Sequence, residues 1–235
     1  MTAYAFPIGV IGGLGPLAGA AFYRHLVEAA GPVDDSGHPE TVLLSDPAIP
    51  SRLDHLLGHG PSPLPRLVSV ARRLADMGCG VLALTSITTH AYYDALSARV
   101  GVPIVDARAA VARAVAESGA RRPALAGTGP ARRLGLLDAP LRAAGLDPVH
   151  PDDAAQRELD ALVREVKARG VTPDAVRRLT RILSGGWRAD ADALVIACTD
   201  LSPLAEAVPG AHDVSRVLAR AVLDRARATA PAARP

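Results

Sequence analysis

Short apolar runs, each closed by a turn or a polar group, recur along this chain at intervals that suit alternating strands and helices. The run Leu194–Ala197 is wholly apolar and ends on Cys198, Thr199 and Asp200. Such a run is typical of a parallel strand that is buried on both faces. Because ligands bind beyond the carboxyl ends of these strands in open α/β sheets, Cys198 is predicted to lie at a strand tip that faces a crevice.

A second run, from Gly80 to Leu84, has the same form. It closes on hydroxyl residues and His90, and Ser86 holds the place that Cys198 holds 112 positions later. The repeated pattern predicts two related half-chains, each of which offers one strand tip to a shared cleft.

The same patterns predict the remaining elements. Further strands are expected at residues 8–11, 41–45, 102–105 and 124–126, with a short strand and turn at 147–151. Helices are expected at residues 17–29, 64–77, 90–99, 106–118, 134–144, 154–169, 173–184, 203–208 and 214–228. The Ala/Pro tail from Ala230 is expected to be disordered.

Composition narrows the classes of function. The 235 residues are 49% hydrophobic, which allows a sizeable core, and the net charge of +2 comes without any run of like charge. We therefore expect no nucleic-acid or membrane partner. No stretch approaches the roughly 20 apolar residues of a membrane-spanning helix. The start of the chain lacks a basic region of the signal-peptide type, and two cysteines suit a reducing cytoplasm, so a cytoplasmic protein is expected.

Cofactor and metal chemistry find little support in the sequence. No Cys/His cluster has zinc spacing, so no metal site is expected. Lys167 is the single lysine, so a pyridoxal enzyme would have only one residue available for its Schiff base. The turn Gly13-x-Gly15-x-x-Ala18 fits a dinucleotide fingerprint, but any strand–turn–helix corner favours these residues. A nicotinamide-dependent oxidoreductase rests on that turn alone.

A cysteine at a strand tip can act as a nucleophile or as a base. Backbone N–H groups at the start of the next helix are expected to lower the pKa of Cys198. A thiolate can take a proton from a carbon next to a carboxylate, provided that cations and N–H groups hold that carboxylate. Arg52, in a proline-bounded loop, could fork onto a carboxylate, or it could be an ordinary solvated arginine. The structural alternative for Cys198 is a buried packing thiol.

Several motifs together resemble the pyridoxal-independent aspartate/glutamate racemase family, over nearly the whole chain. These motifs are Gly12–Ala18, Ile49–Arg52, Thr88–His90, Gln156 with Lys167, and Ala197–Asp200. The resemblance implies an α/β fold of two pseudo-symmetric domains, each with a mostly parallel sheet flanked by helices and with the active site in the interdomain cleft. We place these domains at residues 1–105 plus 214–235 and at residues 106–213. It also implies a homodimer that needs no cofactor and acts on a small carboxylate.

The resemblance also assigns roles to residues. The family uses one cysteine at each strand tip, which makes Cys198 the main acid/base, and its loop arginine, here Arg52, grips a substrate carboxylate. Lys167 matches a helix lysine that reaches the site, and Thr199 would contribute a hydroxyl or N–H group. We expect the remaining substrate contacts to come from Gly13, Thr88, Thr89 and Thr128.

Three departures from the family pattern affect the expected chemistry. The first catalytic cysteine is replaced by Ser86, the neighbouring asparagine by Ile87, and a second threonine by Ala131. A serine hydroxyl is a far poorer base than a thiolate at neutral pH. We therefore expect Ser86, ordered by His90, to serve or line the opposite face of the substrate.

Three functions remain open from the sequence. The first is proton transfer by Cys198 at the carbon next to a carboxylate, as a racemase or isomerase. The second is a single-cysteine decarboxylase or another lyase of the same superfamily. The third is a carboxylate-binding protein that has lost its chemistry.

Overall fold

The computed structural model describes residues 4–31 and 34–228, and for Ala228 the backbone alone. The tail from Ala230, which the sequence predicts to be disordered, lies outside these residues. The chain forms two compact units. The first unit comprises Met1–Ala107 and Leu218–Pro235, and the second comprises Arg108–Val217.

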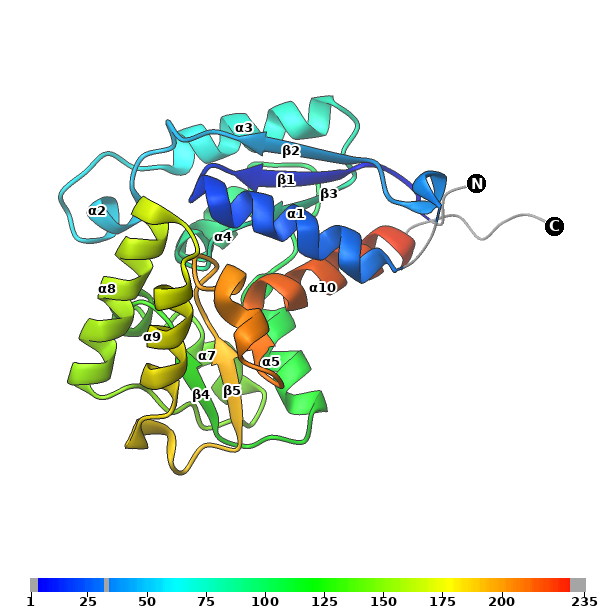
Figure 1. Cartoon of the computed structure of the whole chain (residues 1–235). Coiled ribbons are helices and arrows are strands. Elements are labelled where there is room, and N and C mark those ends of the chain that lie inside the picture. The colour runs from blue at the N-terminus through cyan, green and yellow to red at the C-terminus, as the bar shows by residue number, and fades with distance from the viewer. Residues whose placement is uncertain (1–3, 32–33, 229–235) are drawn as a thin grey trace. The chain divides into compact units, whose positions relative to one another are not determined.

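The first unit is built on a parallel sheet with the order β2-β1-β3 (Figure 1). All five residues of the central strand β1 are buried, as its apolar sequence requires. A single bridge between Leu82 and Ile104 continues the sheet beyond β3. The strands are β1 (Ile8–Gly12), β2 (Thr41–Ser45) and β3 (Val81–Leu84).

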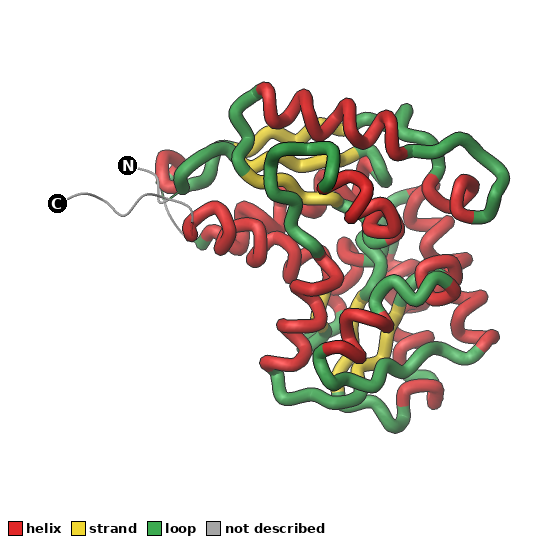
Figure 2. Tube along the Cα trace, turned by 180° about the vertical axis from the view of Figure 1, so that it is seen from behind, coloured by secondary structure: helices red, strands yellow, loops and turns green. Residues whose placement is uncertain are grey.

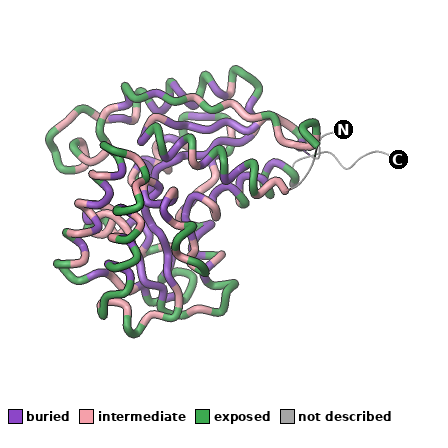
Figure 3. The backbone as a smooth tube through the Cα atoms, viewed as in Figure 1, coloured by how far each residue is buried: buried purple, intermediate pink, exposed green. Residues whose placement is uncertain are grey.

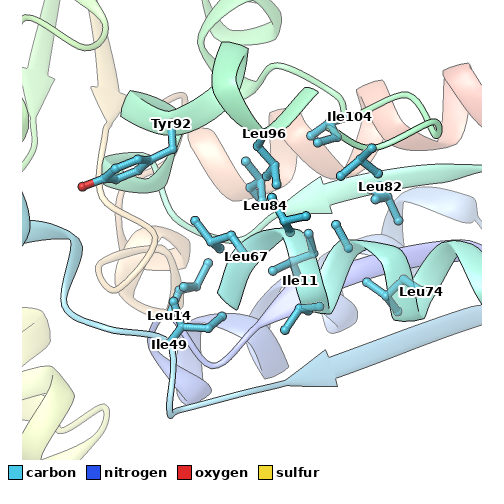
Figure 4. Close-up of a cluster of buried hydrophobic side chains, with 14 of the residues drawn as sticks. Ile11, Leu14, Ile49, Leu67, Leu74, Leu82, Leu84, Tyr92, Leu96 and Ile104 are labelled. Carbon is cyan, nitrogen blue, oxygen red and sulfur yellow. The ribbon is translucent and has the colours of Figure 1, made fainter. Parts of the chain in front are cut away.

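Helices cover both faces of this sheet. Alternate strand residues such as Ile11, Leu82 and Leu84 join a cluster with Leu67 of α3 and Leu96 of α4 (Figure 4). Helix α1 packs against the opposite face. These helices are α1 (Pro16–Ala30), α3 (Leu64–Asp76) and α4 (Tyr93–Ser97).

The last helix, α10 (Val214–Ala228), belongs mostly to this first unit. Near its end, the Arg227 guanidinium donates a hydrogen bond of 2.8 Å to the Tyr4 hydroxyl. The Ala226 carbonyl accepts a hydrogen bond of 3.4 Å from the Ala5 N–H. The C-terminal helix therefore secures the segment that leads into β1.

The second unit repeats this plan. Its parallel sheet has the order β4-β5-β6, and a bridge between Ala124 and Val149 continues it on the other side of β4. In each unit the extended segments therefore follow the spatial order second, first, third, fourth. The strands are β4 (Pro123–Ala126), β5 (Ala193–Ile196) and β6 (His212–Asp213).

The longest helix pair of this unit, α8 and α9, lies side by side over one face of the sheet (Figure 1). Asp152 and Thr172 cap the two helices by accepting hydrogen bonds from backbone N–H groups in the first turn. Figure 2 shows the strands of this sheet from behind. In Figure 3 the strands are mostly buried, whereas much of the surrounding helices is exposed. The helices are α5 (Ala107–Glu117), α6 (Gly129–Arg133), α7 (Asp138–Ala143), α8 (Asp153–Arg169) and α9 (Pro173–Leu183).

The α/β fold with two parallel sheets is confirmed, and five predicted elements differ in detail. The strand predicted at residues 147–151 is reduced to the bridge at Val149. The helix predicted at residues 90–99 is a 3₁₀ helix over Thr88–Tyr92 followed by α4. The predicted strand at residues 102–105 shrinks to one bridged residue, because Pro103 has no N–H for the ladder. The predicted helix at 134–144 begins only at Asp138, because Gly135 adopts a φ of +58°. The predicted helix at 203–208 is a 3₁₀ helix.

The sequence patterns missed α2 (Arg52–Leu56), α6, β6 and two of the 3₁₀ helices, all of which are five residues long or shorter. Elements this short carry too few residues to show a period. The 3₁₀ helices are η1 (Asp35–Gly37), η2 (Thr88–Tyr92), η3 (Gly186–Arg188) and η4 (Ser202–Ala207). Within residues 4–31 and 34–228, no helix has the length and apolar character needed to cross a membrane.

Candidate active site

The carboxyl end of β5 carries the single cysteine of the second unit. Leu194 to Thr199 are all buried, so the strand delivers Cys198 into a protected position just beyond its last paired residue. The Cys198 Sγ lies 3.9 Å from Oδ2 of Asp200 and is oriented to donate to it. The same oxygen forms an ion pair of 2.8 Å with Nζ of Lys167, from the last turn of α8.

The electrostatics of this group favour the neutral thiol. Burial and, to a smaller extent, the Asp200 carboxylate raise the pKa of Cys198 to about 12, against the opposing effects of backbone N–H groups and Lys167. The sequence-based expectation of a lowered thiol pKa is therefore wrong. The reason is that desolvation outweighs the backbone N–H groups at the start of the following turn.

The loop after β4 is fixed by helix α8. Gln156 donates from Nε2 to the Gly127 carbonyl over 3.0 Å, and Asp160 accepts a hydrogen bond of 2.8 Å from the Gly129 N–H. Thr128 in this loop caps α6 by accepting a hydrogen bond of 3.4 Å from the Ala131 N–H. Thr128 thus stands after the first strand of the second unit, and Cys198 after the neighbouring strand.

A small pocket opens beside this loop. Its walls combine apolar side chains with an arginine and with an Asp138–His150 pair at 2.8 Å. Arg132, Asp138 and His150 were not predicted as site residues, because they come from separate elements and share no regular spacing. The lining residues are Leu125, Gly127, Thr128, Ala131, Arg132, Leu137, Asp138, His150, Gln156 and Ala197.

In the first unit, the glycine turn after β1 is shaped by a close backbone approach. Gly13 has a φ of +80°, and a Cβ there would lie 2.3 Å from the carbonyl carbon of Asp46. The Asp46 carboxylate in turn accepts hydrogen bonds from the Ala48 N–H, at 3.1 Å, and from Nε of Arg66, at 2.6 Å. The Arg66 guanidinium lowers the pKa of Asp46. Chain packing therefore accounts for Gly13 without a dinucleotide.

Arg52 is positioned by the loop that follows Asp46. It begins α2, and its Nη2 donates a hydrogen bond of 2.5 Å to the Leu14 carbonyl in the glycine turn. Burial raises the pKa of Tyr92 against a smaller opposing effect of the Arg52 charge, and the Tyr92 hydroxyl is 2.7 Å from Nδ1 of His55. Figure 4 shows this hydroxyl directed away from the apolar cluster. Tyr92 and His55 were not predicted as site residues.

The carboxyl end of β3 presents Ser86 and Ile87, both buried. The Ser86 carbonyl accepts a hydrogen bond of 3.2 Å from the Thr89 N–H, so the chain turns at once into η2. Thr88 is partly exposed. Thr89 is fully buried, and its hydroxyl has no hydrogen-bond partner within the described part of the chain.

The His90 ring makes two hydrogen bonds to the backbone. Its Nε2 accepts a hydrogen bond of 3.1 Å from the Ala107 N–H, and its Nδ1 lies 3.0 Å from the Ser86 carbonyl. Nε2 therefore carries the lone pair and Nδ1 the proton, which it donates. The ring is buried and stacks on Tyr93. With both nitrogens hydrogen-bonded to the backbone, the His90 ring connects the turn after β3 to the start of α5.

The residues predicted from the sequence thus form two groups. In the second unit, Cys198 and Lys167 come together through Asp200, and Thr199 follows the thiol in the same buried segment. In the first unit, Arg52 and the Gly13 turn come together through the Leu14 carbonyl. Metal ligation has no candidate in the described residues, which contain no cluster of three or more His, Cys, Asp or Glu side chains suited to an ion.

Comparisons with known proteins agree with this architecture. A family model described as Asp/Glu/Hydantoin racemase matches residues 11–233. An aspartate racemase from Picrophilus torridus is 24% identical, with a TM-score of 0.84 and coverage of 94% of each chain. A putative Asp/Glu racemase from Yersinia pestis is 20% identical, with a TM-score of 0.77 and coverage of 96% of this chain and 99% of that one.

The similarity of fold also includes a mutant of a decarboxylase. A glycine-to-cysteine mutant of arylmalonate decarboxylase is 20% identical, with a TM-score of 0.53 and coverage of 97% of this chain and 96% of that one. At these identities the three structures show a shared fold.

Proposed function

Because this chain belongs to the Asp/Glu/hydantoin racemase family, we propose that it transfers a proton at the carbon next to a carboxylate of a small acid, without a cofactor, and that Cys198 is the acid/base. The observation that carries the proposal is the placement of Cys198. A buried thiol stands at the carboxyl end of a parallel strand, and its proton is directed to a carboxylate. This edge of a sheet is where α/β proteins bind ligands.

The other predicted residues supply binding in this proposal. The Arg52 guanidinium takes the substrate carboxylate in a forked pair, and the turn at Gly13 lies beside it. The hydroxyl groups of Thr88, Thr128 and Thr199 complete the contacts. Holding the carboxylate with cations and donors stabilises the negative charge that develops when the neighbouring carbon loses its proton.

The chemical step moves one proton and one electron pair. In the removal direction, the Cys198 thiolate takes the proton from the carbon, and the electron pair of the C–H bond passes into the carboxylate as an enolate. In the delivery direction, the S–H proton goes to the carbon and the sulfur keeps the electron pair. A racemase needs such a group on each face of the carbon, and Ser86 is our candidate for the second face.

A second candidate function follows from the protonation of the thiol. Decarboxylation of a malonate-type acid releases CO₂ and leaves an enolate, which needs only a proton donor. The raised pKa of Cys198 and its contact with Asp200 suit donation, and Ser86 supplies no second thiol. The fold shared with arylmalonate decarboxylase is consistent with this candidate.

Deuterium exchange tests the proposal directly. The protein is incubated in D₂O with a panel of amino acids, hydroxy acids, hydantoins and malonates, and the proton on the reacting carbon is followed by NMR. Solvent deuterium should enter at least one compound, with or without release of CO₂. The proposal fails if no compound exchanges or loses CO₂ across the panel.

Restoring a thiol at position 86 should increase exchange. We expect Ser86→Cys to raise the rate of α-deuterium exchange about tenfold or more, because a thiolate is a far better base than a hydroxyl. The product should also approach a racemate. Ser86→Ala is the matched control, and an equal rate in the two variants would show that position 86 does not face the reacting carbon.

Shortening the donor fork at position 52 should weaken substrate binding. We expect Arg52→Lys to raise KM roughly 10- to 100-fold with a smaller change in kcat, because lysine cannot form a bidentate pair with a carboxylate. Arg24→Lys, on the exposed face of α1, should leave KM within about twofold. An unchanged KM in Arg52→Lys would remove Arg52 from the substrate site.

A further inference from the structure

Asp200 lies between the thiol and the lysine and contacts both. Its Oδ2 is 2.8 Å from Nζ of Lys167 and 3.9 Å from Sγ of Cys198. Only 12% of the Asp200 side chain is exposed, whereas 44% of the Lys167 side chain is. The Asp200 carboxylate is therefore largely shielded from solvent, whereas the Lys167 ammonium group remains in contact with solvent.

These two groups act on the thiol with opposite sign. A negative charge beside a thiol opposes formation of the thiolate, and a positive charge favours it. Among the described residues, Asp200 in the loop after β5 and Lys167 on α8 are the charged groups that influence Cys198 in this way. The two members of the ion pair thus have opposite effects on how tightly Cys198 holds its S–H proton.

We infer that Asp200 is a positioning residue that holds the proton on Cys198, and that Lys167 is the charge partner that moderates its effect. The inference rests on the proposed function, in which the Cys198 proton is the one transferred. It assigns Lys167 a role beyond the substrate contact that the family resemblance implies, and it assigns Asp200 a role that the sequence analysis did not.

The arrangement makes the two directions of proton transfer unequal. Delivery needs no preparation, since the S–H proton passes to a carbanion and leaves a thiolate. Removal requires that the S–H proton first leave the sulfur, and Oδ2 of Asp200 is the acceptor to which that S–H group is directed. The carboxylate then becomes a carboxylic acid, the thiolate takes the proton from carbon, and the carboxylic acid remains to be deprotonated. Reactions that form a carbanion by bond cleavage and then protonate it are therefore the better match.

Two charge-removing variants of the same ion pair test this inference. In a Cys79→Ala background, so that Cys198 is the only thiol, alkylation by iodoacetamide is measured from pH 7 to 11. Asp200→Asn should raise the rate at pH 8 by roughly tenfold or more, and Lys167→Met should lower it several-fold. Both variants break the same contact, so a merely structural role would move the two rates in the same direction.

Further variants guard against loss of fold. Lys167→Arg keeps the charge and should restore the parental pH profile, and its site is exposed enough to accept the change. Glu158→Gln removes an acid whose ion pair with Arg181 also joins α8 to α9, and it should leave alkylation unchanged. Rates that shift together in Asp200→Asn and Lys167→Met, or that do not shift, would overturn the inference.

The alkylation assay needs no substrate, so it separates this inference from the proposed function. Suppose that the alkylation rates of Asp200→Asn and Lys167→Met shift in opposite directions but no compound exchanges deuterium. The control of the Cys198 proton by Asp200 and Lys167 would then stand, and the proposed enzyme activity would fail. If deuterium exchange depends on Cys198 but neither variant changes the alkylation rate, the proposed function would stand and this inference would fail.

Discussion

Replacement of Cys198 with alanine is expected to reduce α-deuterium exchange by roughly 100- to 10,000-fold, which is the contribution that a positioned acid/base makes to proton transfer. The methyl side chain keeps the position apolar and removes the sulfur together with its transferable proton. Binding by the rest of the site should persist, so substrate should still protect the protein against thermal unfolding. The rate is measured by NMR in D₂O with the compound that the panel identifies.

Cys79→Ala is the matched control for this experiment. Cys79 is also a buried free cysteine whose pKa is raised by burial, but it lies before β3 and packs in the core of the first unit. Its replacement should leave exchange within about twofold and should cost about 1 kcal/mol of stability through lost packing. Exchange that survives in Cys198→Ala, or that disappears equally in both variants, would rule out Cys198 as the proton carrier.

Cys198→Ser refines the interpretation. The hydroxyl occupies nearly the same volume and can still donate a hydrogen bond to Asp200, but it transfers a proton to or from carbon far less readily. We expect a rate close to that of the alanine variant. A serine variant that retained substantial activity would indicate that the group at position 198 orients the substrate and that another group carries the proton.

Much of the fold was accessible from the sequence because burial of a parallel strand leaves a clear pattern. The runs at Ile8–Ile11 and Leu194–Ala197 can be buried on both faces only within a covered sheet, and both are strands in the structure. The exceptions arise from single backbone properties. Pro103 interrupts a ladder, and the positive φ of Gly135 delays a helix.

The site was less accessible, because hydrogen bonds between elements have no period. Cys198 and Lys167 could be selected from the position of one and the rarity of the other, but the residue that joins them was overlooked. A signal existed, since Asp200 follows the cysteine by two positions at the start of a loop. The burial of His90 and its two hydrogen bonds to the backbone likewise become visible only in three dimensions.

The second large effect is expected at Gly13, where alanine should destabilise the first unit by about 2–5 kcal/mol. Two costs combine there. An L-residue at a φ of +80° costs roughly 1–2 kcal/mol, and the added Cβ would lie 2.3 Å from the backbone of Asp46, which adds an overpacking cost of about 1–3 kcal/mol. Since whole domains are stable by only about 5–15 kcal/mol, this change should markedly lower the unfolding temperature.

Gly78→Ala separates these two costs. Gly78 has a φ of +85° at the end of α3, and a Cβ there would meet no atom within 4 Å. That variant should lose only the conformational part, roughly 1–2 kcal/mol, in urea and thermal unfolding. If Gly13→Ala proves as mild as Gly78→Ala, the turn can move away from Asp46. The loop that carries Arg52 would then be adjustable, and its geometry would not depend on the glycine. If Gly13→Ala lowers the free energy of unfolding far more than Gly78→Ala, the glycine turn is rigid. The turn packs closely on the Asp46 backbone, and its Leu14 carbonyl accepts the Arg52 hydrogen bond, so a rigid turn would also fix the position of Arg52.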